Sequence, residues 1–310
     1  MLHDAFSDVL ALVGARSAIA GGFVAGGRWA IRFPPPALVK FFIAARGECW
    51  LQVDGEAAPA RLREGEVFLL AAPRSFRLAS ALDVPPRAAS ELFSGAASDI
   101  PRIGEGDTFL FFGGHVSFED AQAPLIIESL PPVLHLPAGG AEAGTLQTLI
   151  HLLLEEHRAT RPGASFAATQ IAQLMFLQIL RACAAETGPG ISGRLRILAD
   201  RRLAPALQHM HAEPGRAWQL DELARLAGMS RTAFAVHFKA VAGVAPLAYL
   251  TEWRMRLAQR ELDRTNTSFA ELAATLGYAS ESAFSTAFKR VTGLSPKHYR
   301  AKARHARTGA

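Results

Sequence analysis

The stretch that decides the fold is a duplicated segment in the last third of the chain. Its first copy, residues 220–250, reads LDELARLAGMSRTAFAVHFKAVAGVAPLAYL, and its second copy, residues 269–300, reads FAELAATLGYASESAFSTAFKRVTGLSPKHYR. Thirteen positions are identical when one extra residue is allowed in the second copy, from Glu222 matched with Glu271 to Tyr249 matched with Tyr299. Self-similarity of this length indicates two copies of one structural unit.

Each copy carries the local signals of a helix followed by a tight turn and a second helix. In the first copy, Gly228 comes just after a short helical pattern, where a left-handed residue closes a helix without steric cost. Ser230 then stands where a side chain can accept a hydrogen bond from the start of the next helix. Phe234 and Phe238 lie four residues apart, on one helical face. This pattern predicts a helix-turn-helix unit, whose second helix fits a DNA major groove.

The residues between the copies predict a single connecting helix. Residues 246–265 start at a proline and contain no internal helix breaker. A helix of this size is roughly 25–30 Å long at about 1.5 Å per residue, close to the ~34 Å of one turn of duplex. We therefore expect two recognition helices in one chain, reading major-groove segments about 10 base pairs apart.

Positive charge is concentrated in the same part of the chain. Of the 33 Lys and Arg and 28 Asp and Glu residues, 17 and 9 respectively lie in residues 200–310, so residues 1–199 are slightly acidic. A basic region beside an acidic remainder favours a polyanionic partner. From charge alone, a solvated basic face without a partner is an equally good interpretation.

The first 135 residues are typical of β structure. Short apolar and aromatic runs at residues 40–45, 49–53, 67–70 and 108–112 are separated by turn signals such as Asp54-Gly55. Strands of this length and spacing predict a small sandwich or barrel. Residues 5–13 predict a short amphipathic helix ahead of it.

Residues 141–186 change to a helical period. The second of two predicted helices, residues 166–185, is apolar almost all round, so it must be buried. Burial in the core and burial in a subunit interface are equally good interpretations. A Gly188-Pro189-Gly190 stretch then predicts a flexible boundary.

Composition excludes several classes of protein. A chain of 310 residues suggests about two domains, and its 50% hydrophobic content excludes extensive disorder. No uninterrupted apolar run reaches the roughly 18 residues of a membrane helix, and the N-terminus begins with acidic rather than basic residues. Two cysteines exclude a disulfide scaffold and a thiolate zinc cluster. We expect a cytoplasmic protein.

The C-terminal pattern resembles the DNA-binding domain of the AraC/XylS family of transcription regulators, and the N-terminal half resembles the cupin-type sensor of one subgroup. The motifs that carry the resemblance are Glu222-Leu223-Ala224, Gly228-Met229-Ser230, Phe238-Lys239, Trp253-Arg254-Met255, Gly277-Tyr278, Ser295-Pro296, Gly47-Glu48-Cys49-Trp50-Leu51, Gly114-His115 and Leu130-Pro131-Pro132.

The resemblance implies an α+β multidomain fold: a jelly-roll, cupin-like β domain with a helical dimerisation segment, then an all-α domain of two helix-turn-helix units joined by a linker helix. Its expected divisions are an effector and dimerisation domain (1–186, β-rich over 1–135 and helical over 141–186), a linker (187–197) and a DNA-binding domain (198–304), with helix-turn-helix units at 220–241 and 269–291.

The resemblance also implies which side chains face DNA bases. In the first unit these are Arg231, Thr232, Ala235 and Val236, and in the second Glu281, Ser282, Ser285 and Thr286. An arginine can read a guanine edge with two hydrogen bonds, whereas alanine and valine offer only apolar contact. Many relatives carry arginine at the position of Thr286, so the second unit is expected to read DNA less strongly. Any one of these residues can equally be a solvated surface position.

Six residues are candidate phosphate contacts, which add affinity without reading sequence. They are Ser230, Lys239, Arg254, Arg256, Lys289 and Arg290. The basic tail over residues 300–307 is expected to be a disordered extension that adds non-specific attraction.

Catalytic, metal and cofactor sites are not expected. The β-rich region holds only His3, His115 and His135, without the paired histidines of a cupin metal site. We expect His115 to be a hydrogen-bonded structural histidine. Cys49 and Cys183 are expected to be buried and inert, with Cys49 as a redox sensor kept as a hypothesis. Some regulators of the subgroup that this chain resembles carry a cysteine where this chain has Gly113, which argues against a two-cysteine switch of the same design.

These expectations describe a cytoplasmic, homodimeric transcription activator that binds promoter DNA and RNA polymerase and senses a small effector or a stress signal. Its effector pocket should lie in the β-rich half, where Trp29, Phe41, Trp50 and Phe68 are candidate lining residues, although core packing is the better interpretation of each. Two alternatives remain: a cupin-type metalloenzyme with a helical assembly domain, and a protein-interaction module that no longer binds DNA.

Overall fold

The computed structural model describes residues 4–93, 100–118, 122–139, 143–159, 161–185 and 193–308. The chain divides into two compact units. The sheet unit comprises Ala15–Ser117 and Leu130–Gly190, and the helical unit comprises Met1–Gly14, Phe118–Ser129 and Ile191–Ala310.

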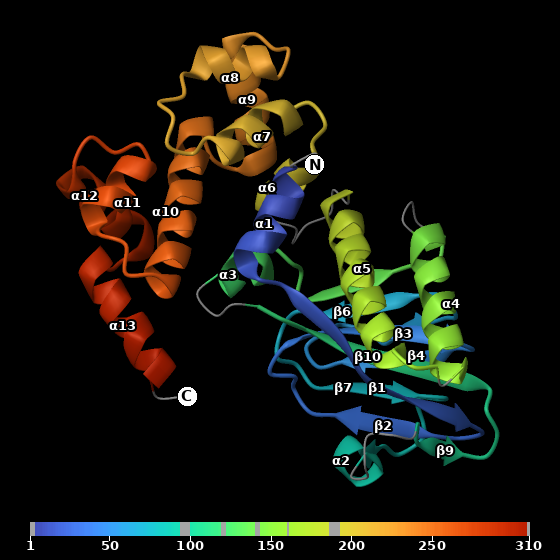
Figure 1. The fold of residues 1–310 in the computed structure, drawn as a ribbon. Helices are drawn as coiled ribbons and strands as arrows, with labels where there is room; N and C mark the ends of the chain where they lie inside the picture. Colours follow the sequence, from blue (N-terminus) through green and yellow to red (C-terminus); the bar gives the residue numbers. More distant parts are fainter. Residues whose placement is uncertain are drawn as a thin grey trace. The chain divides into compact units, whose positions relative to one another are not determined.

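The sheet unit contains two facing sheets, as the alternation of short strands and turns predicts (Figure 1). The larger sheet has the order β11 (Val133–Leu136), β6 (Val67–Leu70), β3 (Val39–Arg46), β10 (Phe109–Ser117), β1 (Arg16–Gly26) and β9 (Arg102–Gly104). The smaller sheet has the order β5 (Ala60–Leu62), β4 (Cys49–Val53), β7 (Phe76–Ala79), β2 (Ala30–Phe33) and β8 (Arg87–Ala88), and α2 (Ala89–Leu92) follows it.

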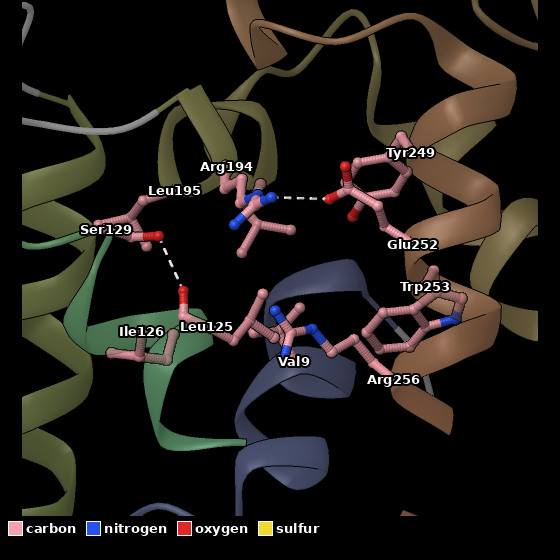
Figure 2. Close-up of a pocket in the computed structure, with 11 residues that line it drawn as sticks. Val9, Leu125, Ile126, Ser129, Arg194, Leu195, Tyr249, Glu252, Trp253 and Arg256 are labelled. Carbon is pink, nitrogen blue, oxygen red and sulfur yellow. Dashed lines mark hydrogen bonds and ion pairs between the residues drawn. The ribbon is translucent and has the colours of Figure 1, made fainter. Parts of the chain in front are cut away.

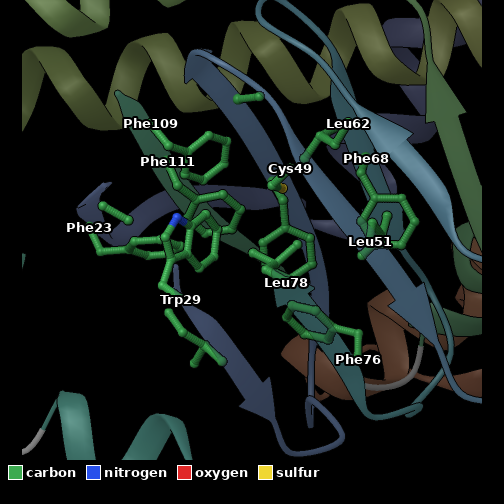
Figure 3. Close-up of a cluster of buried hydrophobic side chains, with 14 of the residues drawn as sticks. Phe23, Trp29, Cys49, Leu51, Leu62, Phe68, Phe76, Leu78, Phe109 and Phe111 are labelled. Carbon is green, nitrogen blue, oxygen red and sulfur yellow. The ribbon is translucent and has the colours of Figure 1, made fainter. Parts of the chain in front are cut away.

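Aromatic side chains fill the space between the two sheets (Figure 3). Phe23 meets the edge of Trp29 with ring centroids 5.4 Å apart, and Trp29 stacks on Phe109 at 5.1 Å. Phe68 belongs to the same cluster. Burial of large apolar side chains is the main favourable contribution to folding, at about 1.5–3 kcal/mol each, so these rings explain why the short strands hold together.

Two helices, α4 (Ala143–Ala159) and α5 (Ala164–Ala185), pack on each other and on the larger sheet. The backbone N–H of Ser17 on β1 donates to Gln173 Oε1 of α5 at 2.8 Å, and Gln173 Nε2 donates to the Ala15 carbonyl at 3.0 Å. Among the described residues, α5 alone is long and apolar enough to cross a membrane as a single helix. Its packing against β1 and α4 accounts for part of that apolar character, and other apolar side chains of α5 are exposed.

The helical unit contains both expected helix-turn-helix units. Its helices from residue 193 onward are α6 (Gly193–Ala199), α7 (Ala204–Ala212), α8 (Leu220–Leu226), α9 (Arg231–Ala242), α10 (Pro246–Arg264), α11 (Phe269–Thr275), α12 (Glu281–Thr292) and α13 (Pro296–Thr308). The first unit is α8–α9, the second is α11–α12, and α10 connects them.

Two local expectations differ from the structure. Part of the expected linker is α6, which is helical because Leu195 and Ile197 are buried in the helical unit. The expected disordered tail, residues 300–307, is part of helix α13, and its Arg300 guanidinium lies over the Phe269 ring at 4.3 Å. The positive charge of the tail and the glycines of the linker did not reveal that both segments have packing partners in the folded chain.

The N-terminal segment of the chain belongs to the helical unit, together with a second segment from the first half of the sequence. Asp4 caps the N-terminus of α1 (Ala5–Val13), and its carboxylate accepts a hydrogen bond from the Ser7 N–H at 3.0 Å. Ala5 is part of the first helix-turn-helix core, and α3 (Ala123–Ile127) packs against α1. The structural division therefore differs from a continuous effector domain over residues 1–186.

Candidate nucleic-acid interface

The two recognition helices, α9 and α12, begin and end in the same way. The Ser230 hydroxyl oxygen accepts from the Ala233 N–H at 3.3 Å, and the Ser280 hydroxyl oxygen accepts from the Ala283 N–H at 3.1 Å. Each helix ends at a left-handed glycine. These caps satisfy backbone groups that a helix end leaves unpaired, so both helices start at a defined residue.

The first recognition face lies on the exposed side of α9. Arg231, Thr232 and Val236 are exposed, with Val236 at 65%, and Ala235 is half-buried. Arg231 forms an exposed ion pair with Asp221 at 3.6 Å. Such pairs contribute at most about 1 kcal/mol, so the guanidinium can leave Asp221 for a guanine edge at small cost.

The second recognition face is polar and carries no positive charge at the four matching positions. Glu281, Ser282 and Thr286 are exposed, and Ser285 is half-buried. The Thr286 hydroxyl donates to the Ser282 carbonyl at 3.0 Å, which leaves its oxygen available as an acceptor. This face offers fewer strong donors to base edges than α9.

Four of the six candidate phosphate contacts are on the surface. Ser230, Lys239, Lys289 and Arg290 are all exposed. Ser230 uses its oxygen as the helix cap and keeps its O–H free to donate to a phosphate. Phosphate binding by these four residues stays a prediction.

Arg254 does not fit the expectation of a phosphate contact. Its Nε donates to the Pro214 carbonyl at 2.6 Å, and its terminal nitrogen donates to the Arg216 carbonyl at 2.9 Å. Its guanidinium also lies 5.7 Å from the centre of the Tyr278 ring. The side chain therefore fastens the loop before α8 to α10 and to the second helix-turn-helix unit.

Arg256 is likewise engaged inside the helical unit. It lines a small cavity of about 30 Å³ with Arg194, Glu252 and residues of α1 and α3 (Figure 2). Burial lowers the pKa of its guanidinium, and the nearby Arg194 adds to that effect. Gln122, next to α3, donates to the Arg256 carbonyl at 3.4 Å. A phosphate contact is not supported for this residue.

Two glycines bring the helix-turn-helix units into backbone contact, a feature that sequence reasoning missed. A Cβ atom on Gly215 would lie 2.3 Å from the Thr275 carbonyl oxygen, and a Cβ on Gly277 would lie 2.0 Å from the Gly215 carbonyl oxygen. Only glycine permits this approach. Together with the contacts of Arg254, this backbone contact limits how far the first helix-turn-helix unit can rotate relative to the second.

The histidines of the β-rich region have different environments. His135 Nε2 lies 2.8 Å from a carboxylate oxygen of the buried Glu66, so it is a structural residue. The His115 side chain makes no hydrogen bond to any described residue, contrary to expectation. Within the described ranges, no group of three or more His, Cys, Asp or Glu side chains is placed to hold a metal ion.

Cys49 lies in the aromatic core of the sheet unit (Figure 3). It is fully buried, and this burial raises the pKa of its thiol well above the ordinary value. Reactive cysteines instead have low pKa values and partial exposure. This environment fits the inert thiol that we expected, and Cys183 is buried as well.

The sheet unit also contains an open cavity of about 1220 Å³. None of the four aromatic residues proposed from sequence lines it: Trp29, Phe41 and Phe68 are buried in packed regions, and Trp50 lies under Arg61 at 4.6 Å. The cavity is lined instead by β1, β3, β10, the segment after β2, α2 and the start of α5.

Comparison with known proteins extends over almost the whole chain. A family model described as Cupin matches residues 4–185, and one described as a helix-turn-helix domain matches residues 223–302. Putative AraC-like transcription regulators of Streptomyces antibioticus and Streptomyces lividans are 40% and 41% identical over 297 and 298 residues, each match covering 96% of this chain and 98% of the relative. The RCS-specific HTH-type transcriptional activator RclR of Escherichia coli is 33% identical over 184 residues, 59% of this chain and 64% of the relative.

Proposed function

The chain belongs to the AraC family of DNA-binding transcription regulators, and from that premise we propose that it is a dimeric, cytoplasmic activator that reads promoters with both recognition helices and responds to a small effector. Its relatives are named as regulators, and nothing in the described residues favours the cupin-type enzyme.

One observation carries the promoter-binding proposal. Two equivalently capped recognition helices are joined by the single helix α10, which has 19 residues and is about 28 Å long. That length is close to the ~34 Å repeat of the major groove on one side of a duplex. The exposed basic residues Lys239, Lys289 and Arg290 are suited to the phosphates between the two segments.

Selection of genomic fragments by the full-length protein at physiological salt tests this proposal. We expect the retained fragments to share two short elements about 10 base pairs apart. Retention without a shared element would mean that only electrostatic binding remains. Failure to retain fragments even at low salt would contradict promoter binding and favour the protein-interaction module.

The dimerisation proposal rests on exposed apolar side chains of the helical pair in the sheet unit. Phe166 and Leu174 on α5 are 72% and 48% exposed, and Leu152 on α4 is 43% exposed. Exposed apolar residues of this kind often mark subunit interfaces. We expect Leu174→Glu to shift the sedimentation profile from dimer to monomer. Leu82→Glu, at an apolar position of similar exposure elsewhere in the sheet unit, should leave it unchanged.

The strands that line the large cavity continue directly into segments of the helical unit, which gives effector binding a route to DNA affinity. Strands β1 and β10 line the large cavity, and along the chain they adjoin the segments that contain α1 and α3 of the helical unit. We propose that effector binding alters these strands and thereby the DNA affinity, by linkage. Transcription in vitro with RNA polymerase should rise when protein is added to a template selected as above, and a fall would identify a repressor.

Redox sensing by Cys49 remains a separate hypothesis. Because burial raises the pKa of this thiol, we expect Cys49→Ser to respond to hypochlorite as the unaltered protein does, with DNA affinity as the measurement. A response that disappears only in this variant would establish Cys49 as the sensor.

A further inference from the structure

Lys40 occupies an unusual place in the sheet unit. It is the only lysine in residues 1–199, and it lines the large cavity on strand β3. The arginines of the same unit repeatedly have acidic partners: Arg28 pairs with Asp83 at 2.7 Å and Arg74 with Glu56 at 2.7 Å. The Lys40 side chain is half-buried and makes no ion pair or hydrogen bond with any described residue.

The strand register places Lys40 beside His115 on the inner face of the larger sheet. The two residues are directly opposite each other where β3 pairs with β10. Side chains two residues apart on a strand share a face, and Phe42 and Phe111, two and four residues further along their strands, belong to the core between the sheets. Lys40 and His115 therefore extend the face that carries these rings.

The rest of the cavity wall is mostly apolar and contains no acidic residue among its described members, although Ser90, His157, Ser165 and Thr169 also line it. Phenylalanine rings dominate the wall next to the Lys40–His115 pair, with Phe42 and Phe111 stacked at 5.6 Å and Phe42 and Phe76 in contact at 4.6 Å. The phenylalanines that line the cavity are Phe23, Phe33, Phe42, Phe76, Phe93, Phe111 and Phe112.

We propose that this cavity binds an organic monocarboxylate with an apolar body, the carboxylate at Lys40 and His115 and the body against the phenylalanine wall. This inference rests on the proposed effector response and names the chemical class of the effector. A partly buried ammonium that has no acidic partner among the described residues attracts a single anion. The apolar wall gains from burying a hydrocarbon or aromatic group, and it penalises a polar one.

Gly113 leaves the space between the charged pair and the rings open. It lies between Phe111 and His115 on the inner face of β10, and a Cβ atom there would be 3.5 Å from the nearest ring atoms of Phe111 and Phe42. That distance is ordinary van der Waals contact, so the backbone tolerates a Cβ atom at this position. A side chain as large as leucine would extend beyond the Cβ atom and occupy the cavity. Gly113→Leu is therefore a variant that blocks the site without changing its charge.

Calorimetric titration of the full-length protein with decanoate and decan-1-ol tests the proposal, because the two probes share a chain and differ in charge. We expect decanoate to bind at least about tenfold more tightly, as a charge-assisted contact predicts. Lys40→Met should abolish this preference while retaining decanol binding, and Gly113→Leu should bind neither probe. The control Arg28→Met removes an exposed cation outside the cavity and should behave as the unaltered protein.

Equal affinity for the two probes in the unaltered protein, or an unchanged preference in Lys40→Met, would overturn the proposal. Because Lys40 is the only lysine of its half of the chain, amine labelling provides a second readout. Decanoate should slow the reductive methylation of Lys40, followed by peptide mass spectrometry, and leave the exposed Lys297 and Lys302 unchanged. Absence of protection at Lys40 would contradict the assigned position of the carboxylate.

Failure of the site and failure of the proposed function give different results. Decanoate that binds through Lys40 without altering DNA affinity would support the site and remove its role as an effector site. A protein that binds selected DNA but shows no Lys40-dependent binding of decanoate would keep the regulator and exclude this class of ligand.

Discussion

The first and second helix-turn-helix units have one backbone design and two different surfaces. The residues repeated between them are mostly buried or in turns: Phe234 and Phe238 correspond to Phe284 and Phe288, all fully buried. The exposed positions of α9 and α12 differ, with Arg231 on one and Glu281 on the other. Packing therefore keeps the two copies alike, while the solvent-exposed face is free to take a different chemistry.

The units also differ in what supports them. The first core includes Ala5 of α1 and helix α7, whereas the second core is completed by Tyr299 of α13. α8 begins with a reciprocal cap between Gln219 and Glu222, and α11 begins with Ser268 accepting from the Glu271 N–H at 3.1 Å. The two helix-turn-helix units therefore share a backbone design but pack against different neighbouring helices. Matched substitutions in the two units measure how far they fold and bind DNA independently.

The largest effect should come from removing equivalent core rings. Phe234→Ala and Phe284→Ala each delete a fully buried ring, which typically costs about 3–5 kcal/mol of folding free energy. We expect similar losses in urea unfolding followed by circular dichroism. A loss in one variant more than twice that in the other would show that the two cores are not equivalent.

Equivalent turn glycines should have unequal effects. Gly228 and Gly277 both have positive φ, 63° and 76°, so alanine at either site costs about 1–2 kcal/mol. Only Gly277→Ala also places a Cβ atom against the Gly215 carbonyl oxygen, whereas Gly228 has open space. Gly277→Ala should be the more destabilising variant and should relax the 10-base-pair spacing preference in the selected fragments. Equal behaviour of the two variants would contradict the backbone contact between units.

The recognition faces should contribute unequally to DNA reading. Arg231→Ala is expected to lose about 1–3 kcal/mol of binding and to relax one base position in the first element. Glu281→Ala should change affinity little or raise it, because it removes a negative charge near phosphates. Binding to systematically altered sites measures both effects. A uniform loss over all sequences in Arg231→Ala would reassign that residue to phosphate contact.

Acidification should weaken the first unit through a histidine that the second lacks. Burial lowers the pKa of His211, and the nearby Asp8 only partly opposes this effect. The unfolded chain therefore takes up the proton more readily, so stability present above the unfolded value of about 6.5 is lost as the pH falls below it. Urea midpoints at pH 7.5 and 5.5 should differ less in His211→Phe than in the unaltered protein. The exposed His298→Gln should keep the full difference.

The sequence was sufficient to predict the structural features that depend on residues close to one another along the chain. Turn glycines, the Ser230 cap, the period of the phenylalanines and the repeat itself predicted both helix-turn-helix units and α10 to within one residue. The strands Cys49–Val53 and Val67–Leu70 were also predicted with their observed ends. The base-reading positions came from family resemblance, and their role in binding DNA stays a prediction.

Features set by contacts between distant segments were not predictable. Arg254 is one of several exposed-looking cations in sequence, and only the folded chain brings it to the Pro214 and Arg216 carbonyls. An effector pocket in the β-rich half stays a prediction. None of the four candidate aromatic residues lines the cavity found there, and Trp29, Phe41 and Phe68 are buried, in agreement with the preferred interpretation of core packing. Period-2 patterns do not say which end of a strand meets an opening. The sequence did not reveal the role of Lys40, because its lack of an acidic partner among the described residues depends on the folded positions of the carboxylates.

The position of α1 has a consequence for how the protein is made. α1 is synthesised before the whole sheet unit, yet its partners α7 and α10 are more than 190 residues further along the chain. A contact of this sequence separation forms late and slowly. The helical unit can therefore complete its core only after most of the chain has left the ribosome. In a C-terminal fragment that starts at residue 193, the surfaces that bind α1 and α3 would be exposed to solvent. Such a fragment should aggregate more readily than the full chain, and a chaperone should be needed to keep it in solution.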